Sequence, residues 1–139
     1  MSVETARRAL TAAVDEAGIR PKELAFISPH GSGTRKGDRV ELSAIANLLS
    51  GDHASVPISG LKPYTGHMGA ASDLAEVALS LTALEHGMAP ATLNFKTPEA
   101  GFEEVDVVTA PRRVGARYAL SMSQGLGVNL WPSFSPAGS

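Results

Sequence analysis

The sequence feature that most constrains the fold is a histidine on a glycine-rich loop, His30-Gly-Ser-Gly-Thr-Arg-Lys-Gly-Asp38. An apolar run precedes this loop at Leu24–Ser28 and is typical of a buried strand. Glycines at positions 31, 33 and 37 permit positive φ angles and a close approach of the backbone to a ligand. A helical pattern resumes at Asp38. A histidine between a strand end and a helix start lies where α/β folds bind their ligands.

A second glycine turn carries His67, within the stretch from Lys62 to Ser72. It follows another strand-like run, Val56–Ser59, and precedes a long apolar pattern that predicts a helix over Met68–Glu85. The apolar positions of that helix are Leu74, Val77, Ala78, Leu81 and Leu84. Because small residues follow His67, the helix can pack closely against a site. Two such loops on one short chain are not expected from composition alone.

The rest of the chain alternates helical and strand patterns. Val3–Ala17 is predicted to be an amphipathic helix, and Asp38–Leu49 a second one, in which Asp38 is the candidate N-cap. Two further strands are predicted at Val105–Thr109 and Tyr118–Ser123. This alternation predicts an α/β fold with a mostly parallel or mixed sheet covered by helices.

Composition limits the classes of function. The chain has 139 residues, enough for one domain, and a net charge of −2 from 12 basic and 14 acidic side chains, which argues against nucleic-acid binding and a polybasic membrane anchor. No apolar run is long enough to span a bilayer, and residues 1–4 do not resemble a signal peptide, so a cytoplasmic protein is expected. The chain contains no cysteine, which excludes a disulfide, a thiolate metal site and a cysteine nucleophile within it.

The two loops resemble motifs of the β-ketoacyl synthases. His30-Gly-Ser-Gly-Thr with Gly37-Asp38 is similar to the first histidine motif of that family, and Lys62-x-x-x-Gly66-His67 is similar to the second, with the same spacing from lysine to histidine. Further segments match in the same order: Leu81–Gly87, Ala91–Phe95 and Ser123–Gly127. Five motifs in the right order make the resemblance specific. It covers the chain from about position 3 to position 127.

The resemblance implies the C-terminal half of a thiolase-like fold, in which two similar halves pack around a pseudo-dyad. Residues 1–131 are expected to form this half-domain, and residues 132–139 a disordered tail that is rich in proline and small residues. The final strand of the family is interrupted here by Trp131-Pro132-Ser133-Phe134, which predicts a broken hydrogen-bond ladder.

The reaction that the resemblance implies is a decarboxylative Claisen condensation of acyl and malonyl thioesters. An acyl group on a cysteine is attacked by the carbanion that forms when the malonyl thioester loses carbon dioxide. His30 and His67 match the two histidines that donate hydrogen bonds to the enolate oxygen. Lys62 matches the buried lysine of the family, and these three residues are expected to be catalytic. The other two histidines, His53 and His86, are interpreted as surface residues.

Carboxylates are expected to support these catalytic groups. Glu41 stands where the family has a carboxylate that pairs with the lysine, so a Lys62–Glu41 pair is predicted to orient His67. Asp38 lies one turn earlier on the same helix face. Glu76 matches a glutamate that helps to hold a monovalent cation in some relatives.

The remaining matches concern substrate binding. Ser32 and Thr34 match hydroxyls that contact the phosphopantetheine arm in relatives, although ordinary hydrogen bonds within the loop would use the same groups. The backbone N–H of Leu126 matches an oxyanion donor, while its side chain replaces the gating phenylalanine of the family. Met122 replaces the asparagine that would bind the cation, so no metal is expected. No cofactor of its own is expected either, because the substrates are carried on the phosphopantetheine of an acyl carrier protein.

The missing cysteine leaves three interpretations open. In the first, the chain is the C-terminal subunit of a split β-ketoacyl synthase of polyketide or fatty acid biosynthesis, and a partner chain with the N-terminal half supplies the cysteine. Such a pair would form a hetero-oligomer, for example a dimer of heterodimers, and would act with an acyl carrier protein. In the second, the chain is a non-catalytic partner of a complete ketosynthase, like a chain-length factor, although those subunits usually lose the histidine motifs. In the third, it is a fragment of a longer synthase.

Overall fold

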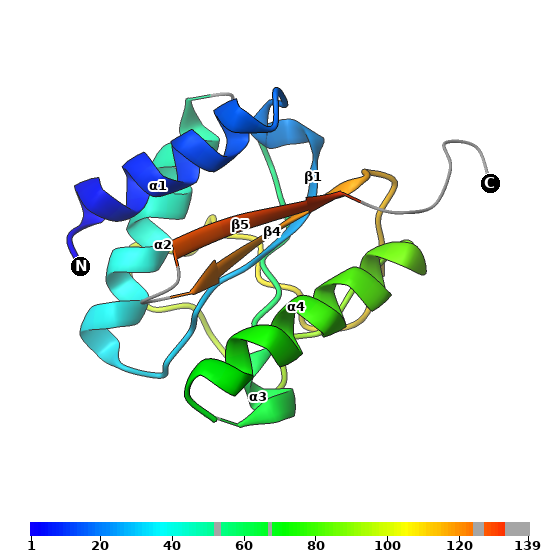
Figure 1. Ribbon diagram of the computed structural model, residues 1–139. Helices are drawn as coiled ribbons and strands as arrows, with labels where there is room; N and C mark the ends of the chain where they lie inside the picture. The colour runs from blue at the N-terminus through cyan, green and yellow to red at the C-terminus, as the bar shows by residue number, and fades with distance from the viewer. Residues whose placement is uncertain (52–53, 67, 124–126, 133–139) are drawn as a thin grey trace.

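In the computed structural model, which describes residues 1–51, 54–66, 68–123 and 127–132, helices lie on both faces of a central sheet (Figure 1). The sheet has the strand order β1-β4-β5, where β1 is Leu24–Ser28, β4 is Tyr118–Ser123 and β5 is Gly127–Pro132. β1 runs parallel to β4, and β5 runs antiparallel to β4. The expected α/β class is confirmed, and β1 and β4 coincide with the predicted strands.

The ladder between β4 and β5 is longer than the sequence predicts. Its antiparallel register continues through Trp131 to Pro132, which stands opposite Tyr118. The predicted interruption is therefore wrong at these two residues. β5 is at the end of the strand order, where a proline at the last position removes little from the ladder. Positions 133–139, which hold the rest of the expected tail, lie outside the described residues.

Two expected strands are reduced to single bridges. Ile58 pairs in parallel with β1 on one side and with Val107 on the other, so the segments 56–59 and 105–109 do extend the sheet beyond β1. Pro57 has no N–H to donate, and the pairing is confined to its neighbour. The predictions are right in position and wrong in extent.

The first helix, α1 (Val3–Glu16), confirms the predicted one. Ser2 begins the helix, because its Oγ accepts the N–H of Thr5 at 3.1 Å. Gly18 follows the helix end with a φ of 66°, a conformation that favours glycine. The buried residues of α1 are four positions apart and form one stripe: Ala6, Leu10 and Val14.

The second helix, α2 (Arg35–Ser50), begins almost one turn before its predicted start. Thr34 is the N-cap residue, and the N–H of Asp38 donates to the carbonyl oxygen of Thr34 at 2.9 Å. Asp38 therefore lies inside the helix, and the prediction that it is the N-cap is wrong. The periodicity does not show the first turn because that turn has no large apolar residue.

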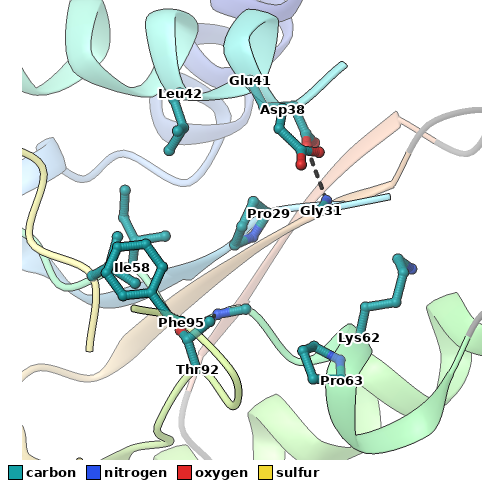
Figure 2. Close-up of a pocket in the computed structure, with 12 residues that line it drawn as sticks. Pro29, Gly31, Asp38, Glu41, Leu42, Ile58, Lys62, Pro63, Thr92 and Phe95 are labelled. Atoms are coloured by element: carbon teal, nitrogen blue, oxygen red, sulfur yellow. Dashed lines mark hydrogen bonds between the residues drawn. The ribbon is translucent and has the colours of Figure 1, made fainter. Parts of the chain in front are cut away.

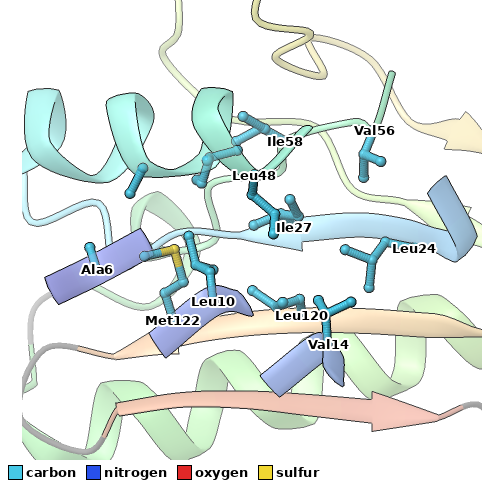
Figure 3. Packing of buried hydrophobic residues seen from close by; sticks show 12 residues of the cluster. Ala6, Leu10, Val14, Leu24, Ile27, Leu48, Val56, Ile58, Leu120 and Met122 are labelled. Carbon is cyan, nitrogen blue, oxygen red and sulfur yellow. The ribbon is translucent and has the colours of Figure 1, made fainter. Parts of the chain in front are cut away.

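Two hydrophobic cores lie on opposite faces of the sheet. Neighbouring residues of β1 divide between them, with Ile27 in the larger and Phe26 in the smaller. The larger core, between the sheet and the helices α1 and α2, includes Ala6, Leu10, Val14, Leu24, Leu48, Val56, Ile58, Leu120 and Met122 (Figure 3). The smaller core, on the side of α4, includes Ala25, Leu84, Ala89, Val108 and Ala119.

The helix α4 (Ala70–Glu85) covers the other face of the sheet, with the short helix α3 (Lys62–Thr65) beside it (Figure 1). α4 begins two residues after its predicted start, because Gly69 has a φ of 61°, which is outside the helical region. α3 was predicted as part of a loop. A proline in its first turn is compatible with a helix start, but it is equally common in turns.

The apolar positions predicted for α4 include both buried and exposed side chains. The side chains that it buries are four positions apart and mostly polar or small: Ser72, Glu76, Ser80 and Leu84. Leu74 is 73% exposed and Leu79 is 38% exposed. Leu74 and Ala78, two of the apolar positions that the sequence indicates for this helix, are therefore exposed, whereas Leu84 is buried. α4 directs Ser72, Glu76, Ser80 and Leu84 inward and exposes Leu74 and Leu79.

Three short elements complete the described chain. A 3₁₀ turn, η1 (Pro21–Glu23), precedes β1. The strand β2 (Met88–Ala89) lies at the start of the segment that follows α4, and it pairs antiparallel with β3 (Arg112–Arg113). Within the part of the chain that the structure describes, no helix has the length and apolar character needed to cross a membrane.

Candidate active site

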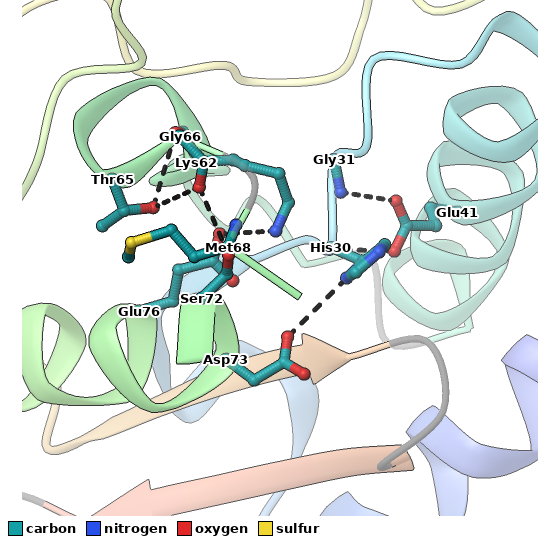
Figure 4. A network of polar contacts seen from close by, with 10 residues as sticks. All are labelled: His30, Gly31, Glu41, Lys62, Thr65, Gly66, Met68, Ser72, Asp73 and Glu76. Atoms are coloured by element: carbon teal, nitrogen blue, oxygen red, sulfur yellow. Dashed lines mark hydrogen bonds and ion pairs between the residues drawn. The ribbon is translucent and has the colours of Figure 1, made fainter. Parts of the chain in front are cut away.

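A carboxylate of α2 holds the loop that carries His30 (Figure 4). Glu41 is buried, and its two oxygens accept the N–H groups of His30 and Gly31, each at 2.9 Å. Gly31 has a φ of 53°, which favours glycine at this position. The predicted pair between Glu41 and Lys62 is wrong as an ion pair, because Lys62 pairs with Glu76, although the charge of Lys62 still opposes the effect of burial on the pKa of Glu41.

Burial makes the carboxyl groups on this face of α2 bind protons more readily. Burial raises the pKa of Glu41, against the opposing effect of the N–H groups of Gly31 and His30. Burial also raises the pKa of Asp38, one turn earlier, against the effects of the Gly33 N–H and of His30. The hydrogen bonds to Glu41 thus offset part of the cost of a buried charge.

Replacing Glu41 by glutamine is expected to lower the free energy of unfolding by about 1–3 kcal/mol. The glutamine side chain offers one acceptor oxygen to two N–H groups, and its own NH₂ group faces the other. Equilibrium unfolding in urea measures the change, with Glu104→Gln on an exposed turn as the matched control. Equal stability of the two variants would contradict the role of Glu41 in holding the loop.

Lys62, the first residue of α3, forms a buried ion pair with Glu76 of α4 (Figure 4). Nζ of Lys62 lies 3.0 Å from Oε1 of Glu76, and the two side chains are 8% and 1% exposed. The sequence predicted a carboxylate partner for the lysine but assigned it to Glu41. The pair joins two helices on either side of position 67 in the chain.

Ser72, which the sequence analysis did not single out, holds the backbone on both sides of position 67. Its Oγ accepts the N–H of Met68 at 2.5 Å and donates to the carbonyl oxygen of Gly66 at 3.2 Å. Gly66 has a φ of 68°, which favours glycine. His67 itself lies outside the described residues, so its place in the site remains a prediction.

A pocket of about 220 Å³ lies between the two motifs (Figure 2). The first motif contributes Gly31 and Asp38 to its lining, α2 contributes Glu41, and the second motif contributes Lys62 and Pro63; the side chain of His30 is not part of the lining. Apolar and hydroxyl groups from the rest of the fold complete the lining, among them Ile58, Thr92 and Phe95. Segments far apart in the sequence therefore share one cavity.

The remaining predicted site residues lie away from these contacts or outside the described chain. The hydroxyls of Ser32 and Thr34 are 3.0 Å apart and share a hydrogen bond within the loop, one of the two uses that the sequence allowed. Met122 is buried in the larger core. Leu126, the predicted oxyanion donor, and His53 lie outside the described residues.

Sequence reasoning also missed a carboxylate beside the first histidine. Asp73, in the first turn of α4, places Oδ1 3.9 Å from Nδ1 of His30, and each side chain is 11% exposed. The only sequence signal is an acidic residue at a helix start, which is common in helices without any functional role. Packing of α4 against β1 and β4 brings the two residues together.

The order of the strands and the helices on both faces of the sheet define a thiolase-like fold. A solved structure, the ketosynthase from module 1 of the bacillaene synthase from Bacillus amyloliquefaciens FZB42, has the same fold with a TM-score of 0.86. That match covers 99% of this chain and 27% of that chain, at 24% identity. Another solved structure, described as a type II PKS acyl-carrier protein in complex with its ketosynthase bound to the hexaketide, is 27% identical, with a TM-score of 0.81 over 93% of this chain and 33% of that chain.

The chain belongs to the β-ketoacyl synthase family, because residues 1–96 match the family model described as Beta-ketoacyl synthase, C-terminal domain. A curated relative, the tetracenomycin polyketide synthase ketoacyl synthase alpha subunit of Streptomyces glaucescens, is 37% identical over 121 residues. This match covers 86% of the present chain but only 28% of the relative, so the chain spans little more than a quarter of that protein's length.

Proposed function

We propose that the chain is the C-terminal subunit of a split β-ketoacyl synthase that acts on acyl carrier protein substrates in the cytoplasm. It supplies His30, His67 and Lys62, and a partner chain with the N-terminal half supplies the nucleophilic cysteine. The observation that carries this proposal is a pocket lined from both motifs in a chain without any cysteine. The chain offers groups that stabilise an anion, but it lacks the nucleophile that the family reaction needs.

In the proposed reaction, the partner's cysteine carries the acyl chain as a thioester. Loss of carbon dioxide from a malonyl thioester gives an enolate, whose carbon attacks the acyl carbonyl; a C–C bond forms, the C–S bond breaks, and the cysteine leaves as a thiolate. His30 and His67 donate hydrogen bonds to the enolate oxygen while its charge develops. Ser32 and Thr34 contact the phosphopantetheine arm, and the N–H of Leu126 donates to the oxyanion of the tetrahedral intermediate.

The contacts of the described residues support such a role by fixing both loops before substrate binds. Glu41 holds the backbone of His30 through two hydrogen bonds. Ser72 and the Lys62–Glu76 pair hold the segments that flank position 67. Donors that are held in place need no reorganisation when charge develops, which is the main source of electrostatic stabilisation in enzymes.

The outer side of α4 supports the need for a partner. Leu74 and Leu79 are exposed on this helix, and Met68 and Tyr64 near its start are 51% and 45% exposed. A helix with apolar residues on its outer side as well as a buried inner side is typical of one that further protein covers. A complete thiolase-like fold has two similar halves, so we propose that the N-terminal half covers the outer side of α4.

Reconstitution tests the proposed function. The purified chain, given acyl and malonyl forms of an acyl carrier protein, should form no β-ketoacyl product. Addition of a cysteine-bearing N-terminal-half chain should produce it, as detected by mass spectrometry of the carrier protein. The matched control is the same partner with its cysteine replaced by alanine, which should bind without condensing.

Two results would separate the alternatives. Product from the chain alone would overturn the proposal, because it would require a nucleophile other than cysteine. Product that forms only with a complete ketosynthase, and at the same rate after His30→Ala in this chain, would indicate a subunit like a chain-length factor.

A further inference from the structure

We propose that Asp73 is a positioning residue for His30: it keeps a proton on Nδ1 of the imidazole and leaves Nε2 for the substrate. The inference rests on the juxtaposition of two side chains that are each 11% exposed, His30 after β1 and Asp73 in the first turn of α4 (Figure 4). Nδ1 and Oδ1 are 3.9 Å apart, within the range of an ion pair.

Asp73 is suited to this role because its charge needs compensation. Its Oδ1 is buried and accepts no hydrogen bond from the described residues. A buried carboxylate is costly unless it is paired or hydrogen-bonded. The N-terminus of α4 favours a negative charge in its first turn, and a protonated imidazole supplies the opposite charge directly.

Other charged groups also lie near His30. On α2, both oxygens of Glu41 accept backbone N–H groups, and burial raises the pKa of Asp38 against the smaller, opposing effect of the charge of His30. On α3 and α4, Lys62 and Glu76 pair with each other. Asp73 differs from these groups because its carboxylate forms an ion-pair contact with the ring of His30.

This placement links the action of His30 to pH, on the premise of the proposed function. With a proton on Nδ1, a neutral ring has a lone pair on Nε2 and cannot donate from it; the imidazolium form donates from both nitrogens. Donation to the enolate is therefore available below the pKa of His30 and is lost as pH rises through it. A neighbouring carboxylate raises that pKa and extends the donor form to higher pH.

Hydrogen–deuterium exchange at Cε1 of each histidine, followed by mass spectrometry across a pH series, tests the pairing in dilute samples of the chain. Asp73→Asn should lower the pKa of His30 by about 1 unit or more. His86 is an internal standard, because it lies at the far end of α4 with its Nδ1 2.7 Å from the carbonyl oxygen of Thr82. Asp15→Asn, an equal charge change on the exposed side of α1, should leave the pKa of His30 unchanged.

Asp73→Glu retains the charge and should keep the pKa of His30 closer to that of the unmodified chain. If Asp73→Asn does not fold, as judged by circular dichroism, Asp73→Ser removes the same charge with a smaller side chain. An unchanged pKa of His30 in a folded neutral variant overturns the proposal, and so does an equal fall in the glutamate variant. Because the readout is a pKa and involves no condensation, its failure is distinct from a failure of the proposed function.

Discussion

Replacing Lys62 with methionine is expected to destabilise the folded chain by about 3–5 kcal/mol. Nζ of Lys62 lies 3.0 Å from the carboxylate of Glu76, and both side chains are almost fully buried, so the substitution leaves a buried carboxylate without its lysine. The exposed pair of Glu4 and Arg7 on α1 is the matched control, and its loss in Arg7→Met should change the stability far less, because water screens exposed ion pairs. Equilibrium unfolding in urea measures both changes.

A double variant separates the charge effect from simple loss of packing. Lys62→Met combined with Glu76→Leu should recover most of the lost stability, because well-packed apolar residues often replace a buried ion pair without cost. The difference between the double variant and the sum of the single ones gives the coupling energy of the pair. A Lys62→Met chain as stable as the unmodified one would show that the pair contributes nothing to folding.

Replacing His30 with alanine is expected to lower the rate of condensation in the reconstituted complex by about 10²–10³. Loss of one preorganised donor to the enolate oxygen accounts for a change of this size. The loop should survive the substitution, because Glu41 binds the backbone N–H groups of His30 and Gly31, and alanine at position 30 retains its N–H. The rate of product formation on the carrier protein, at saturating partner chain, measures the effect.

The control for this experiment is His86→Ala. His86 is exposed at the C-terminal end of α4 and does not line the pocket between the two motifs, so its loss should leave the rate unchanged. Thermal unfolding of both variants separates a loss of chemistry from a loss of fold. A folded His30→Ala chain that keeps most of the normal rate would remove His30 from the proposed pair of donors.

Elements that bury one regular face could be predicted from the sequence. All five residues of β1 are buried, as expected for an apolar run. The buried residues of α1 recur every four positions and form one stripe on the helix. The outer side of α4 could not be predicted, because periodicity shows that Leu74 lies on an apolar side but cannot show which side meets the sheet. The inward side, with Ser72 and Ser80, carries a weaker apolar signal than the outward one.

The sequence predicts which loops carry the site, but it does not predict which side chains pair with each other. The first histidine motif lies between β1 and α2, and the second lies before α4, as the sequence predicts. The partner of Lys62 depends on how α3 packs against α4, and two glutamates stood at plausible separations from it. Glu41 is occupied by backbone N–H groups, which no pattern of side chains reveals. Asp73 approaches His30 for the same reason, since only the packed fold brings α4 to the end of β1.

The outward leucines of α4 also determine how an assembly through this face would respond to temperature. Any partner that covers Leu74 and Leu79 removes apolar surface from water, and association of this kind carries a negative change in heat capacity. Near room temperature the driving force is mostly entropic, so it weakens as the solution cools. A complex formed through this helix should therefore dissociate more readily in the cold than at growth temperature, and storage on ice would favour the separated chains.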